Sequence, residues 1–347
     1  ERETIANGLY VAGTSGFTDI ALNANTNPVI DSHSDVSFVI SKAVNSATNL
    51  HPIGALTKDS KGEDLAELYD MKSAGSIAFG DYKKPIENPN LIKIALQYAS
   101  SFEGLVQSYP HESRVAASGV MNENIMSTQL GLKGLPALAE ELQIARDLFI
   151  LEYTEGKLHI PTISTAKSVA LIREAKAKKL DVSCSVAIHN LKYKDECLTD
   201  FDTNFKVNPP LRTASDIEAL IQGVKDGTID MVTSDHNPID IEYKKIEFDY
   251  AKNGTIGLES AFGALNTLFT TKKAVQLLTK GKSRFGLDTT SIKIGSKADL
   301  SLFNPSETYV FEDKHIRSKS KNSLFKGSKL KGTVYGIIAN NTTSIAL

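Results

Sequence analysis

The chain has 347 residues, of which 41% are hydrophobic and 23% are charged, and its formal net charge is −2. This balance is typical of a globular protein with one large domain and room for a small second one. It gives no electrostatic reason to expect nucleic acid or a membrane surface as a partner. The two cysteines show no CxxC or framework spacing, and no apolar run approaches about 18 residues. We therefore expect a cytoplasmic protein from a reducing compartment.

The chain begins with a stretch that reads as a helix, ERETIANGLYVAGTSG, and short apolar, β-branched runs then alternate with helical stretches. Such runs, when turn residues bound them, predict strands. The predicted strands span residues 17–23, 50–56, 76–81, 105–110, 158–164, 181–188 and 230–235. The helical stretches between them include residues 90–102, 165–179 and 213–227. Several of these stretches close on Gly or Lys, as helix C-termini prefer.

The alternation of strands and helices predicts an α/β fold with a parallel sheet wrapped by helices. A (β/α)8 TIM barrel has eight strands, and the chain opens with the helix that should follow the first of them. We therefore expect residues 1–288 to form strands two to eight of such a barrel, with the first strand supplied from upstream of Glu1. From residue 289 to residue 347 the pattern changes to short β runs with Gly and Asn turns. This part predicts the C-terminal portion of a small flanking β-domain.

Function in a barrel of this kind lies at the C-terminal ends of the strands. The candidate residues at those ends are Asn23, Asn25, Asp81, Tyr109, His111, Thr162, His189 and Asp235. Carboxylates, amides and imidazoles at several strand ends can bind a metal or carry out acid–base chemistry. Asp81 and Asp235 fit equally well as caps of the turns that follow their strands. His159 has the opposite strand parity to Thr162, so we expect it in the core or at the lower rim.

Five segments together resemble the class I dihydroorotases, a (β/α)8 metal-hydrolase family of the amidohydrolase superfamily. The resemblance runs along essentially the whole chain. Its segments are SGFTDIALNANTNPVID (15–31), NFKVNPPLR (204–212), DGTIDMVTSDHNPI (226–239), GLES (257–260) and RSKSKNSLFKGSKLKG (317–332). The resemblance implies a zinc pair that generates hydroxide and polarises a ring amide carbonyl, while an Asp shuttles a proton.

The resemblance also assigns roles to residues that this chain retains. Asp81 matches the carboxylate that bridges the metals, and Asp235 matches the general base. Asn25 and Asn208 match substrate-contacting positions.

Three other matched positions depart from the family pattern. Tyr109 and Thr162 stand where imidazole ligands belong, and Ile239 stands where a His contacts the substrate. A phenol with a pKa near about 10 and a Thr hydroxyl are poor substitutes for imidazole at zinc. His111, two residues beyond Tyr109, is an alternative ligand for one metal. We therefore expect no bound zinc, or at most one, although the family's HxHxR motif would precede this sequence.

Three hypotheses follow for a dihydroorotase-like protein of pyrimidine biosynthesis. In the first, the protein is catalytically impaired or inactive and has a structural or regulatory role. In the second, it is an active dihydroorotase, or another hydrolase of cyclic amides, with a reduced metal site. In the third, it binds a cyclic amide or a ureido-carboxylate through Asn25 and Asn208 without turnover. By resemblance we also expect a homodimer and, as a further partner, an aspartate transcarbamoylase chain.

Overall fold

Seven short parallel strands form the central sheet of the protein, whose computed structural model describes residues 2–289 and 291–346. The strand order is β1-β2-β3-β4-β7-β8-β9, so each barrel strand lies beside the next one along the chain. The bounds are Asp19–Leu22 (β1), Asn49–Gly54 (β2), Ala78–Phe79 (β3), Val106–Gln107 (β4), Leu158–Ile160 (β7), Val182–Ala187 (β8) and Met231–Thr233 (β9). Every predicted strand overlaps one of these, and the predicted α/β barrel architecture is confirmed.

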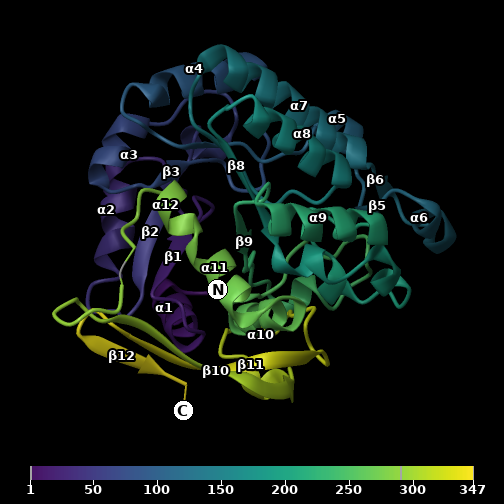
Figure 1. The fold of residues 1–347 in the computed structure, drawn as a ribbon. Coiled ribbons are helices and arrows are strands. Elements are labelled where there is room, and N and C mark those ends of the chain that lie inside the picture. The colour runs from purple at the N-terminus through teal and green to yellow at the C-terminus, as the bar shows by residue number, and fades with distance from the viewer. Residues whose placement is uncertain (1, 290, 347) are drawn as a thin grey trace.

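Helices cover the outside of this sheet. Figure 1 shows α2, α3, α4, α7, α8 and α9 as an arc around the strands. The helices before residue 160 are Ile5–Thr14 (α1), His33–Ser41 (α2), Leu68–Ala74 (α3), Pro89–Ser100 (α4), Ser113–Ala116 (α5), Ile125–Leu130 (α6) and Ala137–Thr154 (α7). The later helices are Ala166–Ala177 (α8), Ala214–Asp226 (α9), Leu258–Leu268 (α10), Thr271–Thr279 (α11) and Gly281–Arg284 (α12). Sheet and helices share one large hydrophobic core.

Local sequence signals explain where these elements begin and end. Helix α9 starts at a capping box, in which the Thr213 side chain accepts from the Asp216 backbone and the Asp216 side chain accepts from the Thr213 backbone. It ends at Gly227, whose φ of 84° suits a residue without a Cβ atom. All six residues of β8 are buried, as expected for a parallel strand with both faces covered. Both ends of α9 are therefore set by its own sequence.

The sheet is open between β1 and β9, which are its two edge strands. Within the described residues, no strand pairs with the outer edge of either one. The expectation that an upstream strand closes the barrel here stays a prediction.

A second, antiparallel sheet packs at one end of the molecule, seen in yellow and green in Figure 1. It consists of Asp299–Val310 (β10), Lys329–Ala339 (β11) and Thr342–Ile345 (β12). Helices α1 and α10 pack against β11, so the small sheet contacts helices from both ends of the barrel segment of the chain. A two-stranded pair, Met121–Asn122 (β5) with Gly134–Leu135 (β6), lies outside both sheets and was not predicted.

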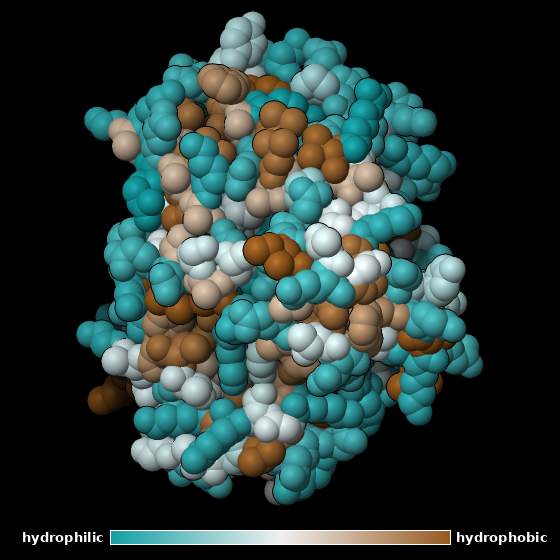
Figure 2. Space-filling model, turned by 90° about the vertical axis from the view of Figure 1, so that its right-hand side faces the viewer, coloured by the Kyte–Doolittle hydropathy of each residue, from teal (hydrophilic) through white to brown (hydrophobic). Residues whose placement is uncertain are grey.

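The surface is a mixture of polar and apolar side chains. Figure 2 shows hydrophobic groups scattered among hydrophilic ones on the side that carries α6 and α9. In the part of the chain that the structure describes, no helix has the length and apolar character needed to cross a membrane.

Candidate functional site

A cavity of about 1150 Å³ runs between the edge strands β1 and β9, from the starts of the strands at Asp19 and Met231 to their C-terminal ends. Most of the predicted strand-end residues share its lining. These are Asn23, Asn25, Asp81, Tyr109, Thr162 and Asp235. The lining also includes Tyr82 and Lys83, which the sequence had not singled out. The fold therefore brings together residues from strand ends that are far apart in the sequence.

The centre of this site is an ion pair between Asp235 and Lys83. Asp235 follows β9, Lys83 follows β3, and Lys83 Nζ lies 2.7 Å from Asp235 Oδ2. The two side chains are only 4% and 13% exposed, so water screens the pair weakly. Asp235 is held further by its backbone N–H, which donates to Thr233 Oγ1 at 3.2 Å. The predicted general-base position is therefore occupied by an acid that is already paired with a cation.

Two phenols lie close to this pair. Burial, reinforced by the Asp235 carboxylate, raises the pKa of Tyr82 well above its ordinary value of 10. Burial and the same carboxylate also raise the pKa of Tyr109 well above 10. Both hydroxyls are therefore protonated at neutral pH and are hydrogen-bond donors rather than anionic metal ligands.

His189, next to this pair, and Thr162, in the lining of the same cavity, have buried polar atoms without a hydrogen-bond partner. His189 is fully buried, neither of its ring nitrogens has a partner, and Nε2 lies 4.0 Å from Asp235 Oδ2. Burial lowers the pKa of His189 to about 4, so its imidazole is neutral. Thr162 Oγ1 is also buried and unpartnered. Polar atoms buried in this way are unusual in native proteins and indicate a site with a role other than folding.

Asp81, which the resemblance places at the metal-bridging position, accepts hydrogen bonds from the turn after β2. The backbone N–H groups of Leu56 and Thr57 donate to Asp81 Oδ1 at 2.8 and 3.1 Å, and the Thr57 hydroxyl donates to Oδ2. Both carboxylate oxygens are therefore engaged by the turn after β2. These contacts are those of a turn cap, and the metal-bridging role of Asp81 stays a prediction.

Ile239 lies in the core and not in the cavity. It is 2% exposed, and its backbone N–H donates to Asn322 Oδ1 at 3.1 Å. This contact joins the DGTIDMVTSDHNPI and RSKSKNSLFKGSKLKG segments of the sequence. His159 is buried as predicted, with its ring nitrogens 2.8 Å from Ser183 Oγ and 3.3 Å from Ser185 Oγ.

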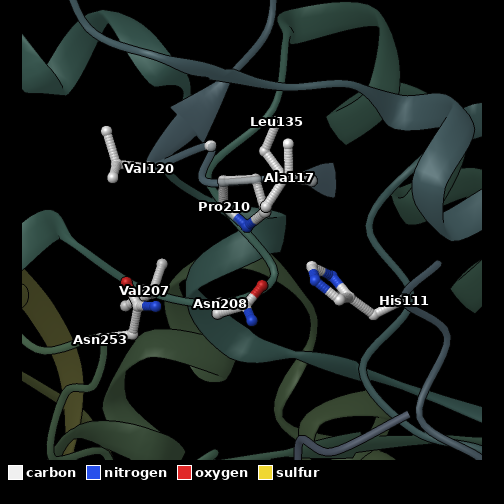
Figure 3. Close-up of a pocket in the computed structure, with 9 residues that line it drawn as sticks. His111, Ala117, Val120, Leu135, Val207, Asn208, Pro210 and Asn253 are labelled. Atoms are coloured by element: carbon white, nitrogen blue, oxygen red, sulfur yellow. The ribbon is translucent and has the colours of Figure 1, made fainter. Parts of the chain in front are cut away.

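A second cavity, of about 150 Å³, contains His111 and Asn208. Figure 3 shows the His111 imidazole and the Asn208 amide pointing toward one another across it. The His111 ring stacks on Tyr109 with centroids 5.9 Å apart, and Asn208 Oδ1 has no partner. Asn25 is exposed and lines only the larger cavity. The two predicted substrate-contacting amides therefore line different cavities.

The side chains described here do not fit a zinc pair. Within residues 2–289 and 291–346, no three His, Cys, Asp or Glu side chains lie together in an arrangement that could hold a metal ion. Tyr109 and Thr162 offer neutral oxygens, Asp81 is engaged by a turn, and Asp235 already has a cation at 2.7 Å. Zinc prefers imidazole, thiolate and free carboxylate ligands.

Known proteins resemble this chain in both sequence and fold. A family profile described as Dihydro-orotase-like matches residues 1–168, and one described as Amidohydrolase family matches residues 134–342. The dihydroorotase of Pelotomaculum thermopropionicum is 42% identical over 97% of this chain and 81% of its own length. That of Acetivibrio thermocellus is 40% identical over 99% of this chain and 83% of its own length. The L-hydantoinase (dihydropyrimidinase) from Arthrobacter aurescens shares the fold, with a TM-score of 0.85 at 18% identity over 99% of this chain and 82% of its own.

Proposed function

This chain belongs to the dihydroorotase family of the amidohydrolases, and we propose that it binds dihydroorotate or a related cyclic amide but opens the ring weakly or not at all. The relatives named dihydroorotase support the ligand class. The residues of the strand-end site support two further parts of the proposal: turnover is lost, and at most one zinc ion is bound. The protein then has a structural or regulatory role in pyrimidine biosynthesis.

The observation that carries this proposal is the Lys83 ammonium, 2.7 Å from Asp235. A general base must accept a proton from the reacting group within hydrogen-bond reach. Here Oδ2 of Asp235 is already in an ion pair with the Lys83 ammonium, which competes with a reacting group for that oxygen. The neutral phenol of Tyr109 and the hydroxyl of Thr162 cannot replace imidazoles in generating a metal-bound hydroxide.

The second candidate function is an active dihydroorotase, or a related hydrolase of cyclic amides, with a reduced metal site. The relatives near 40% identity support it because they are named for that activity. His111 also supports it, since its ring stacks directly on Tyr109 at the ligand position. In this alternative His111, rather than Tyr109, provides a metal ligand.

A binding assay and a turnover assay separate these two functions. We expect isothermal titration calorimetry to show dihydroorotate binding that weakens at least tenfold in Asn25→Ala, because Asn25 lines the larger cavity. The exposed Asn90→Ala serves as the matched control and should bind like the wild type. Ring opening and closure, followed by ultraviolet absorbance, should not exceed the rate without protein. Turnover that disappears in Asp235→Asn would favour the active enzyme, and a wild type without any binding would contradict the proposal.

We propose in addition that the chain forms a homodimer and associates with an aspartate transcarbamoylase chain. Exposed apolar side chains on two adjacent helices provide a surface for such contacts. Helices α4 and α7 pack together, and they expose Ile94, Tyr98, Phe149 and Tyr153. Grouped apolar and aromatic residues on a surface are typical of protein interfaces.

A further inference from the structure

We propose that the Lys83–Asp235 pair is itself the recognition element for the ligand and binds the edge of a cyclic amide without a metal. This inference rests on the proposed function, because it assigns the contacts within the same cavity. A ring forces its amide into the cis form, so the C=O acceptor and the N–H donor point to the same side. The pair presents the complementary donor and acceptor side by side, with Lys83 Nζ and Asp235 Oδ2 2.7 Å apart.

Both members of the pair keep capacity for a ligand. A lysine ammonium has three donors, and Lys83 uses one of them on Asp235. An ionised carboxylate accepts at about four lone-pair positions. The ligand carbonyl can therefore accept from Lys83 while the ligand N–H donates to Asp235. Hydrogen bonds to charged groups are shorter and stronger than neutral ones, so two such contacts give both affinity and orientation.

A second observation points independently to a ligand at this place. Thr162 Oγ1 has no hydrogen-bond partner, although the residue is only 6% exposed and lines the same cavity. His189, beside Asp235, likewise leaves both ring nitrogens unpartnered. The protonated phenol of Tyr82 adds a donor next to Asp235. A small ring with several amide groups offers hydrogen-bond partners to such atoms, whereas an apolar ligand offers none.

This assignment also explains why the site does not fit the zinc pair that the resemblance implied. A zinc ion ligated by Asp235 would lie within a few ångströms of the Lys83 ammonium. Two cations that close repel each other strongly in a buried site. The lysine thus supplies, from the chain itself, the positive charge that balances Asp235. The ligand carbonyl then meets an ammonium group in place of a metal ion.

The test compares two ring ligands that differ only in their N–H groups. The probes are 5,6-dihydrouracil and its 1,3-dimethyl derivative, titrated calorimetrically into the protein. We expect the dimethyl compound to bind the wild type at least tenfold more weakly, because it cannot donate to Asp235. Lys83→Met should weaken dihydrouracil binding at least tenfold. Lys84→Met, the exposed neighbour, is the matched control and should leave binding unchanged.

A double variant shows whether a loss of binding comes from unfolding. Lys83→Met leaves a buried carboxylate unpaired, whereas Lys83→Met combined with Asp235→Leu removes both charges. We expect this double variant to unfold cooperatively on heating and to bind dihydrouracil at least tenfold more weakly than the wild type. Equal binding of the two probes by the wild type, or unchanged dihydrouracil binding in the double variant, would overturn the inference.

Dihydroorotate separates failure of this inference from failure of the proposed function. If the wild type and Lys83→Met bind dihydroorotate with the same affinity, the proposed function stands and the role of Lys83 is refuted. Wild-type protein that binds neither dihydroorotate nor dihydrouracil would remove both.

Discussion

Replacing Lys83 by Met should destabilise the fold, because it leaves the Asp235 carboxylate buried without its counter-ion. The two side chains are 13% and 4% exposed, and their charged atoms are 2.7 Å apart. With an effective dielectric constant of about 20, the Coulomb attraction at this distance is about 6 kcal/mol before desolvation is subtracted. Measurements on buried pairs show that removal of one partner costs about 3–5 kcal/mol. We expect Lys83→Met to lower the free energy of unfolding by an amount within that range.

Urea unfolding at 25 °C and pH 7 measures this loss directly. Lys84→Met should change the free energy of unfolding by less than about 0.5 kcal/mol, as is usual for exposed positions. Lys83→Met combined with Asp235→Leu should recover most of the stability lost in the single variant, because no isolated charge remains buried. A single variant that loses less than about 1 kcal/mol would refute the reasoning, since it would show that water already solvates the pair.

Three further predictions concern metal binding, pH and assembly. Tyr109→His combined with Thr162→His should raise the affinity for zinc. Elemental analysis of the wild type after dialysis should find no more than one zinc ion per chain. Two retained zinc ions would contradict the proposal. Burial, reinforced by a neighbouring lysine, lowers the pKa of Lys244 from 10.5 to about 7. The unfolded chain keeps this proton up to a higher pH than the folded chain. Between pH 7.5 and 8.5 the free energy of unfolding of the wild type should therefore rise by about 1 kcal/mol relative to that of Lys244→Met. The exposed Lys245→Met should show the same pH dependence as the wild type. Light scattering should give the mass of a dimer, and co-purification should recover aspartate transcarbamoylase. A specific interface of either kind should bury at least about 1,000 Å². A monomer at micromolar concentration, alone and mixed with that transferase, would remove the partner proposal.

The barrel could be predicted from the sequence because its strands are short, apolar and separated by helices with clear caps. The run at 181–188 is an example, since its β-branched and small residues favour a strand and all six residues of β8 are buried. The pair formed by β5 and β6 was missed for the opposite reason. Each strand has two residues, and two residues carry no periodicity. Contacts with the chain around them, rather than local preference, determine such strands.

The site could be predicted only in part, because its main contact depends on the tertiary structure. Asp235 was recognisable as an acid at the end of a buried strand. Its partner Lys83 is 152 residues away, and a lysine in a loop usually lies in solvent. The role of Asp81 was also undecidable from the sequence, since a metal ligand and a cap can be the same residue type. A lysine two residues after the strand-end Asp81 is the signal that could have indicated Lys83.

Three residues of the site have backbone conformations that cost stability. Lys83, Thr162 and Asp235 have φ values of 51°, 48° and 46°, which L residues adopt at a cost of about 1–2 kcal/mol each. Thr162→Gly should therefore be about 1 kcal/mol more stable than Thr162→Ala in urea unfolding, because glycine alone adopts this conformation without strain. At Ser168, buried within α8, the order should be reversed, with Gly about 0.5–1 kcal/mol less stable than Ala. If Ala is the more stable residue at both positions, the strain is absent. If the order differs as expected, the chain maintains a strained residue with an unpartnered hydroxyl that folding alone would not favour.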